Sequence, residues 1–269
     1  MKIHYLGTAA AEGWPAVFCQ CDACKAAREM GGKNIRTRSS VLIDDELLLD
    51  LPPDTYLHAL REGLELGRVQ QLLITHSHQD HFYPQELAMR KEPYAHLRSE
   101  QELEVWGNQD VVAQLSELDL RTVSLKAVKP GDTFKAGRFT VTALPADHML
   151  DRTETALLYI IDDGRTKIFY AHDSGWYPEE TWQFLEGANL QLVNFDCTNG
   201  PLPYRRGHMG IPAILEAKAR LEEIGALASD AKCVITHFSH NGGLLHHQLE
   251  EHVAGTGLLV AYDGMILEL

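Results

Sequence analysis

Short apolar runs, many with the alternation typical of β-strands, recur along the 269-residue chain and are separated by turn signals. The pattern predicts strands over residues 2–6, 103–106, 122–128, 138–144, 191–195 and 233–236, and hairpins over 39–51, 156–170 and 258–269. Helical spacing predicts helices over residues 54–65, 84–90, 110–118, 178–184, 212–224 and 244–252. Periodicity alone therefore indicates one domain of mixed α and β structure, with polar residues collecting at strand ends.

The most informative stretch is residues 71–81, where an apolar run leads directly into four candidate metal ligands, His76, His78, Asp80 and His81. If the strand continues past residue 75, side chains 76 and 78 point the same way, because strand residues alternate faces. Asp80 and His81 then lie beyond the strand end, where a turn can direct them at a second point. This spacing suits one metal held by two imidazoles and another held by a carboxylate and an imidazole. The alternative is a polar loop whose histidines share no role.

Three further polar residues directly follow predicted strands. His148 comes after the strand at 138–144, Asp173 after the strand at 167–170, and His237 after the strand at 233–236. His172 is adjacent to Asp173 and competes for the same assignment. Each of these residues alone is more often an ordinary loop residue, so their weight depends on the cluster at 76–81. Zn²⁺, Mn²⁺ and Fe²⁺ all accept such ligands, and the pattern leaves the metal open.

A second candidate site is the cysteine cluster Cys19, Cys21 and Cys24, within a long segment (about 8–37) that shows little periodicity. An insert of that length needs something to fix it in a compact domain. Three thiolates at this spacing can occupy three corners of a tetrahedral Zn²⁺ site, whereas the alternative is three free thiols in a loop. Cys197 and Cys233 stand alone and are expected in the core.

Composition narrows the classes of partner. With 45% hydrophobic residues, the chain can bury a full core as a single domain over 1–269. The formal net charge of −14 argues against a nucleic acid partner and leaves a small anionic substrate open, because bound cations would reverse the charge locally. No apolar run approaches the ~18 residues of a membrane span, and the first residues lack a signal peptide, so we expect a cytoplasmic protein without a membrane partner.

The run from His76 to His81 matches the HxHxDH signature of the metallo-β-lactamase superfamily, which the chain therefore resembles. The resemblance implies a four-layer αββα sandwich across essentially the whole chain. It also implies that His76, His78 and His148 hold one divalent ion, and that Asp80, His81 and His237 hold a second. Asp173 would bridge the two ions.

The cysteine cluster narrows the resemblance to PhnP-like cyclic phosphodiesterases, which carry a Cys-x-Cys-x-x-Cys insert early in the chain. That group holds a structural zinc there, and its fourth ligand is a histidine three residues after the last active-site histidine. His240 stands at that position relative to His237. His246 and His247 are competitors, but we expect them to face solvent on a helix.

The function predicted from these patterns is a metal-dependent phosphodiesterase acting on a small cyclic or simple phosphodiester. Two metals bridged by a carboxylate usually share a water and lower its pKa, so that hydroxide attacks near neutral pH. The catalytic candidates are Asp80 and His208, the latter as the general acid, because related phosphodiesterases carry a Gly-His motif in this loop.

Other interpretations of the site and of the function stay open. Arg205 and Arg206 could hold a phosphate or be solvated loop charge. A lactonase or amidase could use the same metals, and PqqB-like relatives share the fold and the cysteine-type zinc site without being phosphodiesterases, which leaves a redox or binding role. A homodimer is common in the resembling group.

Overall fold

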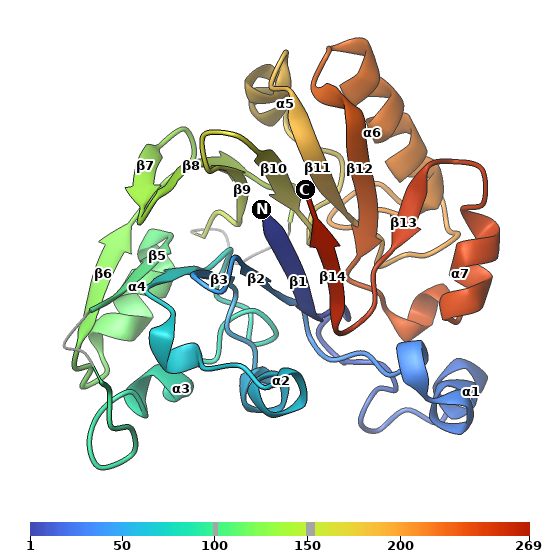
Figure 1. Ribbon diagram of the computed structural model, residues 1–269. Coiled ribbons are helices and arrows are strands. Elements are labelled where there is room, and N and C mark those ends of the chain that lie inside the picture. Colours follow the sequence, from blue (N-terminus) through green and yellow to red (C-terminus); the bar gives the residue numbers. More distant parts are fainter. Residues whose placement is uncertain (99–101, 149–153) are drawn as a thin grey trace.

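Two seven-stranded sheets form the centre of the computed structural model, which describes residues 1–98, 102–148 and 154–269 (Figure 1). The strand order is β14-β1-β2-β3-β4-β5-β6 in the first sheet and β13-β12-β11-β10-β9-β8-β7 in the second. The strands of the first sheet are β1 (Lys2–Gly7), β2 (Ser40–Ile43), β3 (Leu47–Leu49), β4 (Gln71–Leu73), β5 (Leu103–Gly107), β6 (Val123–Ala127) and β14 (Met265–Glu268). Those of the second are β7 (Thr133–Ala136), β8 (Phe139–Pro145), β9 (Leu157–Asp162), β10 (Lys167–Ala171), β11 (Leu190–Asp196), β12 (Leu227–Thr236) and β13 (Leu258–Val260).

Helices cover the outer faces of both sheets (Figure 1). They are α1 (Asp22–Met30), α2 (Thr55–Glu62), α3 (Gln85–Ala88), α4 (Gln109–Ser116), α5 (Glu179–Leu185), α6 (Ile211–Glu223) and α7 (His246–His252). None of the helices in the described ranges is long and apolar enough to cross a membrane.

Three apolar clusters establish the layers. One cluster lies between the sheets and includes Ile3 and Val41 of the first sheet and Leu192 of the second. Another joins the second sheet to α1, α5, α6 and α7, and the third joins the first sheet to α3 and α4. The predicted αββα sandwich is therefore confirmed. Successive residues of a strand point into different layers, so each sheet buries one face in the core between the sheets and the other against helices.

One local prediction is wrong. Residues 258–269 do not form a hairpin, because β13 pairs in parallel with β12 of the second sheet and β14 pairs antiparallel with β1 of the first. The chain crosses between the sheets at residues 261–264, and local turn signals cannot report that crossing. The segment 8–37, which shows little periodicity in the sequence, contains α1.

Helix α2 forms where it is predicted. It ends at Gly63, whose left-handed conformation (φ 64°) is the usual helix C-terminus. Thr55 and His58 are its buried residues, whereas Tyr56, Leu57 and Leu60 are exposed. The apolar spacing predicted the helix correctly, and the structure places these three apolar side chains on its exposed side.

A matched pair of leucines tests this layering. Leu192 in β11 is fully buried between the sheets, and Leu259 in β13 is 40% exposed. We expect Leu192→Ala to lower the free energy of unfolding by about 2–5 kcal/mol, because it removes buried methyl groups and leaves a cavity. Leu259→Ala should cost at most about 1 kcal/mol. Equal losses in urea denaturation would contradict the layer assignment.

Candidate metal centre

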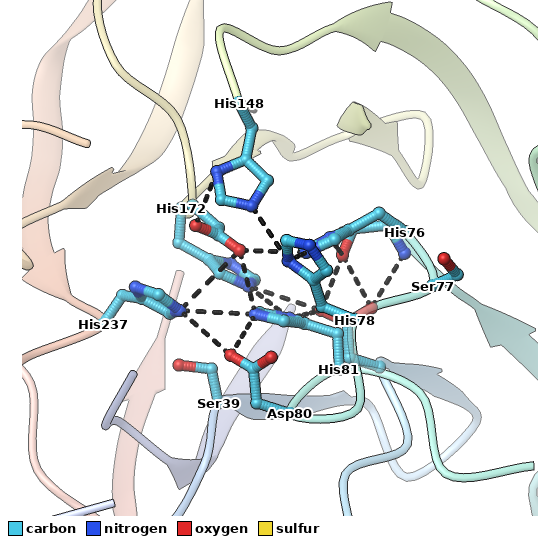
Figure 2. Close-up of polar contacts among 12 residues, drawn as sticks. Ser39, His76, Ser77, His78, Asp80, His81, His148, His172 and His237 are labelled. Carbon is cyan, nitrogen blue, oxygen red and sulfur yellow. Dashed lines mark hydrogen bonds and ion pairs between the residues drawn. The ribbon is translucent and has the colours of Figure 1, made fainter. Parts of the chain in front are cut away.

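The candidate ligands come together at one end of the sandwich. Strands β10, β11 and β12 run parallel, so their carboxyl ends reach the same edge of the second sheet. Asp173 and His237 follow two of these ends, and His148 follows β8. The loop after β4 brings His76 to His81 from the first sheet. Figure 2 shows His148, His237 and Asp80 approaching this point from three different segments.

The first group of donor atoms comes from His76, His78, His148 and Asp173. His76 Nε2 lies 3.0 Å from His78 Nδ1 and 3.1 Å from Asp173 Oδ2. His148 Nε2 lies 3.1 Å from His78 Nδ1. Nitrogen and oxygen ligands about 2.0–2.1 Å from a tetrahedral Zn²⁺ lie about 3.3 Å from one another, so these spacings suit a metal ion.

The second group comes from Asp80, His81, His237 and the same Asp173. His81 Nε2 lies 3.1 Å from Asp80 Oδ2 and 3.3 Å from His237 Nε2. Asp173 Oδ2 lies 3.1 Å from His81 Nε2 as well as from His76 Nε2, so one oxygen stands between the two groups. The proximity of all seven side chains is observed, whereas their roles as ligands stay a prediction.

Backbone conformation supports a functional site here. His237 (φ 61°), directly after β12, and Asp173 (φ 57°), two residues after the end of β10, both adopt the left-handed region. This conformation is uncommon for residues other than glycine and is concentrated at functional sites. In each case it turns the side chain out of the strand direction toward the shared point.

Two buried aspartates that the sequence analysis did not single out orient the histidines. Asp50 Oδ2 lies 2.8 Å from His81 Nδ1, and Asp196 Oδ2 lies 3.4 Å from His237 Nδ1. Thr198 Oγ1 lies 2.8 Å from the same His237 atom. Carboxylates behind ligating histidines fix the ring orientation and raise ligand basicity. Their only sequence signal is that each aspartate ends an apolar strand run, the same signal that marked His148 and Asp173.

The charges of the site favour ionised carboxylates. Burial by itself would raise the pKa of Asp80, but the neighbouring His81 and His237 hold it far below its usual range. The pKa of Asp173 is likewise lowered, against the effect of burial, by the histidines around it. Burial would lower the pKa of His237, yet Asp173, with Asp196 and Asp80, raises it to about 10.

One atom tests whether a cation fits. Asp173 Oδ1 is buried and accepts no hydrogen bond from any side chain in the described ranges, although imidazole Nδ1 atoms of His148 and His208 lie 3.2 and 3.1 Å away. An unpaired carboxylate oxygen surrounded by imidazole nitrogens is what a cation site requires. The donor set therefore fits divalent metal ions.

His208 lies beside these groups rather than within either of them. Its Nδ1 lies 2.9 Å from Asp196 Oδ2, and 31% of its side chain is exposed. Burial lowers the pKa of His208, but the Asp196 charge and hydrogen bond outweigh that effect and raise it. Arg205, three residues earlier, is already engaged, because it stacks on Trp176 (4.1 Å to the ring centroid) and pairs with Glu216 at 3.0 Å. Arg206 is exposed.

The three clustered cysteines meet His240 in a second, separate site. His240 Nδ1 lies 3.7 Å from Cys19 Sγ and 3.5 Å from Cys21 Sγ. Sulfur and nitrogen ligands of a tetrahedral Zn²⁺ lie about 3.6 Å apart, so the spacing suits zinc. The backbone N–H of Cys24 is the main cause that lowers the pKa of Cys21 to about 6, which favours the thiolate.

His246 and His247 differ from each other. His247 is exposed, as predicted, but the expectation that His246 faces solvent is wrong. His246 is 5% exposed, and its Nδ1 lies 2.9 Å from the Arg36 guanidinium. The helix turns this residue inward, and neither histidine joins the cysteine group.

The model of the Beta-lactamase superfamily domain matches residues 47–238, and the chain belongs to the metallo-β-lactamase superfamily of metal-dependent hydrolases. Coenzyme PQQ synthesis protein B of Azoarcus sp. (strain BH72) is 26% identical over 313 aligned positions, covering 100% of both chains. Zinc-bound PqqB from Methylobacterium extorquens has a TM-score of 0.78, 21% identity and 100% coverage of both chains. A diphosphatase of the PhnP family has a TM-score of 0.76 and 21% identity, covering 100% of this chain and 97% of the other.

Removing a single thiolate tests the cysteine site. We expect Cys24→Ser to bind one zinc ion fewer per chain and to unfold at a lower temperature, because a zinc site of this kind contributes directly to folding. Cys233→Ser is the matched control, since Cys233 is buried in β12 outside every candidate metal group. Zinc content by atomic emission that is unchanged in Cys24→Ser would contradict the assignment.

Proposed function

We propose that this protein is a metal-dependent hydrolase that cleaves a small cyclic or simple phosphodiester. The observation that carries the proposal is Asp173 Oδ2, which stands 3.1 Å from imidazole nitrogens of both donor groups. A carboxylate shared in this way would hold two cations close enough to act on one substrate. When bound, two such ions supply a nucleophile from water near neutral pH and offset negative charge on the attacked centre.

The residues of the site have different proposed roles. The histidines and Asp80 would hold the ions and so fix where the scissile group lies, and Asp173 would set the spacing between the two positions. Asp50 and Asp196 hold His81 and His237 in the tautomer that presents Nε2 to the ion. This arrangement stabilises developing charge without reorganisation during the reaction.

His208 is the proposed proton donor for the leaving group. Its Nδ1 is held by Asp196, which leaves Nε2 as the free donor, and its side chain is partly exposed beside the donor groups. The carboxylate of Asp196 raises the pKa of His208 and so favours the protonated ring near neutral pH. An alkoxide leaving from phosphorus requires such a proton.

The expected substrate is small and anionic. The net charge of −14 opposes a nucleic acid. Arg206 is the candidate for contact with a phosphate oxygen, because its neighbour Arg205 is committed to Trp176 and Glu216. We propose no nucleic acid or membrane partner, and a homodimer stays a proposal from the resemblance.

A second candidate function is a PqqB-like role that is not phosphodiester hydrolysis. It is favoured by the similarity to Coenzyme PQQ synthesis protein B over the whole chain. Sequence identity of 26% leaves the substrate open, and the fold is common to both candidates.

Hydrolysis of bis(p-nitrophenyl) phosphate by Zn²⁺- or Mn²⁺-loaded protein separates the candidates. We expect metal-dependent turnover that falls at least about 100-fold in His208→Ala, with a larger loss for an alkyl phosphodiester whose leaving group needs the proton more. His247→Ala is the matched control, since His247 is exposed on α7. Absence of turnover with both ions bound would reject the phosphodiesterase, and lactones would then be tested.

The pH profile tests the link between His208 and Asp196. A general acid acts in its protonated form, so activity is lost as the pH rises through its pKa. Asp196 raises that pKa, and Asp196→Asn should therefore move the alkaline limb of kcat/KM to lower pH. An alkaline limb that does not move, in a variant that retains its metal, would exclude His208 as the acid.

A further inference from the structure

Three buried polar atoms that have no hydrogen-bond partner among the described residues belong to adjacent side chains beneath the candidate metal centre. They are Tyr170 Oη, His172 Nδ1 and Asn194 Nδ2. Each of these side chains is at most 1% exposed. Tyr170 and Asn194 are register partners on the parallel strands β10 and β11, so they stand side by side on one face. The Tyr170 and His172 rings meet edge to face with centroids 4.2 Å apart.

This face looks into the core between the two sheets. Tyr170 belongs to the apolar cluster that fills that space. Tyr5, from the first sheet, donates its hydroxyl to Asn194 Oδ1 across the gap. The amide oxygen of Asn194 is therefore satisfied, whereas its amide nitrogen still requires an acceptor. Unpaired groups so deeply buried are rare in native proteins unless an ordered water satisfies them.

The same group is connected to a candidate ligand. His81 presents Nε2 to the donor group, so its Nδ1 carries the proton and donates to Asp50 Oδ2 at 2.8 Å. His172 Nε2 lies 3.3 Å from the same carboxylate oxygen. A carboxylate only accepts, and His172 Nε2 is therefore the donor. Figure 2 shows His172 directly behind His81.

Because His172 Nε2 donates to Asp50, the type of hydrogen-bond partner that His172 Nδ1 requires is also determined. In a neutral ring that donates from Nε2, Nδ1 is an acceptor and requires a hydrogen from another group. Tyr170 Oη and Asn194 Nδ2 are both donors without acceptors. A single water can accept from each of them and donate to His172 Nδ1, which is the number of bonds that a buried water typically makes.

We propose that one ordered water binds between Tyr170, His172 and Asn194, and that His172, held by this water, is a positioning residue that fixes Asp50 and through it His81. The water site depends only on the protein's own polar atoms. Its effect on His81 rests on the proposed metal centre.

A crystal structure of the metal-loaded protein that resolves ordered waters is the first test. We expect one water within hydrogen-bonding distance of Tyr170 Oη, His172 Nδ1 and Asn194 Nδ2. Direct hydrogen bonds among these side chains, with no water between them, would overturn the proposal. This result does not depend on any substrate or activity.

Metal affinity, measured by competition with a chelator, is the second test. We expect His172→Leu to weaken binding of the second ion about 10-fold, because partners behind a ligand have effects of this size. His172→Gln should recover part of the loss, since its amide can still donate to Asp50. Unchanged affinity for both ions in His172→Leu, with only a lower melting temperature, would make His172 a packing residue and refute the positioning role.

If His172→Leu does not fold, the metal affinities of Tyr170→Phe and Tyr177→Phe are compared instead. Both substitutions remove one buried hydroxyl that has no partner, but Tyr177 lies on the opposite side of the second sheet, against its helices. Weaker binding of the second ion in Tyr170→Phe alone would support the water site. Equal affinities in the two variants would overturn it. Because binding is measured without substrate, failure of the phosphodiesterase proposal would leave this outcome unaffected.

Discussion

The structure depends on four carboxylates that are buried together at one end of the sandwich. Asp50, Asp80, Asp173 and Asp196 are each at most 8% exposed, and each contacts at least one imidazole. Removing a carboxylate from water is costly unless cationic or hydrogen-bonding partners replace the solvent. Histidines supply part of that compensation, and the unpaired oxygen of Asp173 shows where divalent cations would supply the rest. Two fully packed sheets make such a cluster possible, because their strand ends deliver side chains to one point from a rigid framework.

The two candidate metal sites share a short piece of chain. His237 belongs to the donor group at the sandwich end, and His240, three residues later, belongs to the cysteine site. Between them, Phe238 forms backbone hydrogen bonds with Thr8 and Ala10 at 2.9 and 3.0 Å. The cysteine site therefore joins the N-terminal segment and α1 to the loop that carries a candidate metal ligand, His237. An ion bound by Cys19, Cys21, Cys24 and His240 would hold that loop in place.

Membership of the superfamily does not by itself choose a substrate, because a nucleophile generated by bound metal ions can attack either phosphorus or carbonyl carbon. The groups outside the two donor sets therefore bear on which reaction the site catalyses. His208 is held by Asp196, and its loop is anchored where Arg205 stacks on Trp176. A protonated ring in this position can donate a proton to a leaving alkoxide, as the proposed phosphodiester cleavage requires.

The sequence by itself determined those secondary-structure elements and candidate ligands that a short stretch of residues is enough to identify. Apolar runs located the main strands, the spacing of residues 76–81 identified the first cluster, and Cys19 to Cys24 predicted the second site. Only the tertiary structure revealed Asp50, Asp196 and the buried group at His172, because their role arises from strands that meet across the fold. It also decided that residues 258–269 cross between sheets and that α2 exposes its apolar face. Periodicity records that a residue is apolar or polar, whereas the partner it meets depends on sheet order and layer packing, which no local pattern encodes.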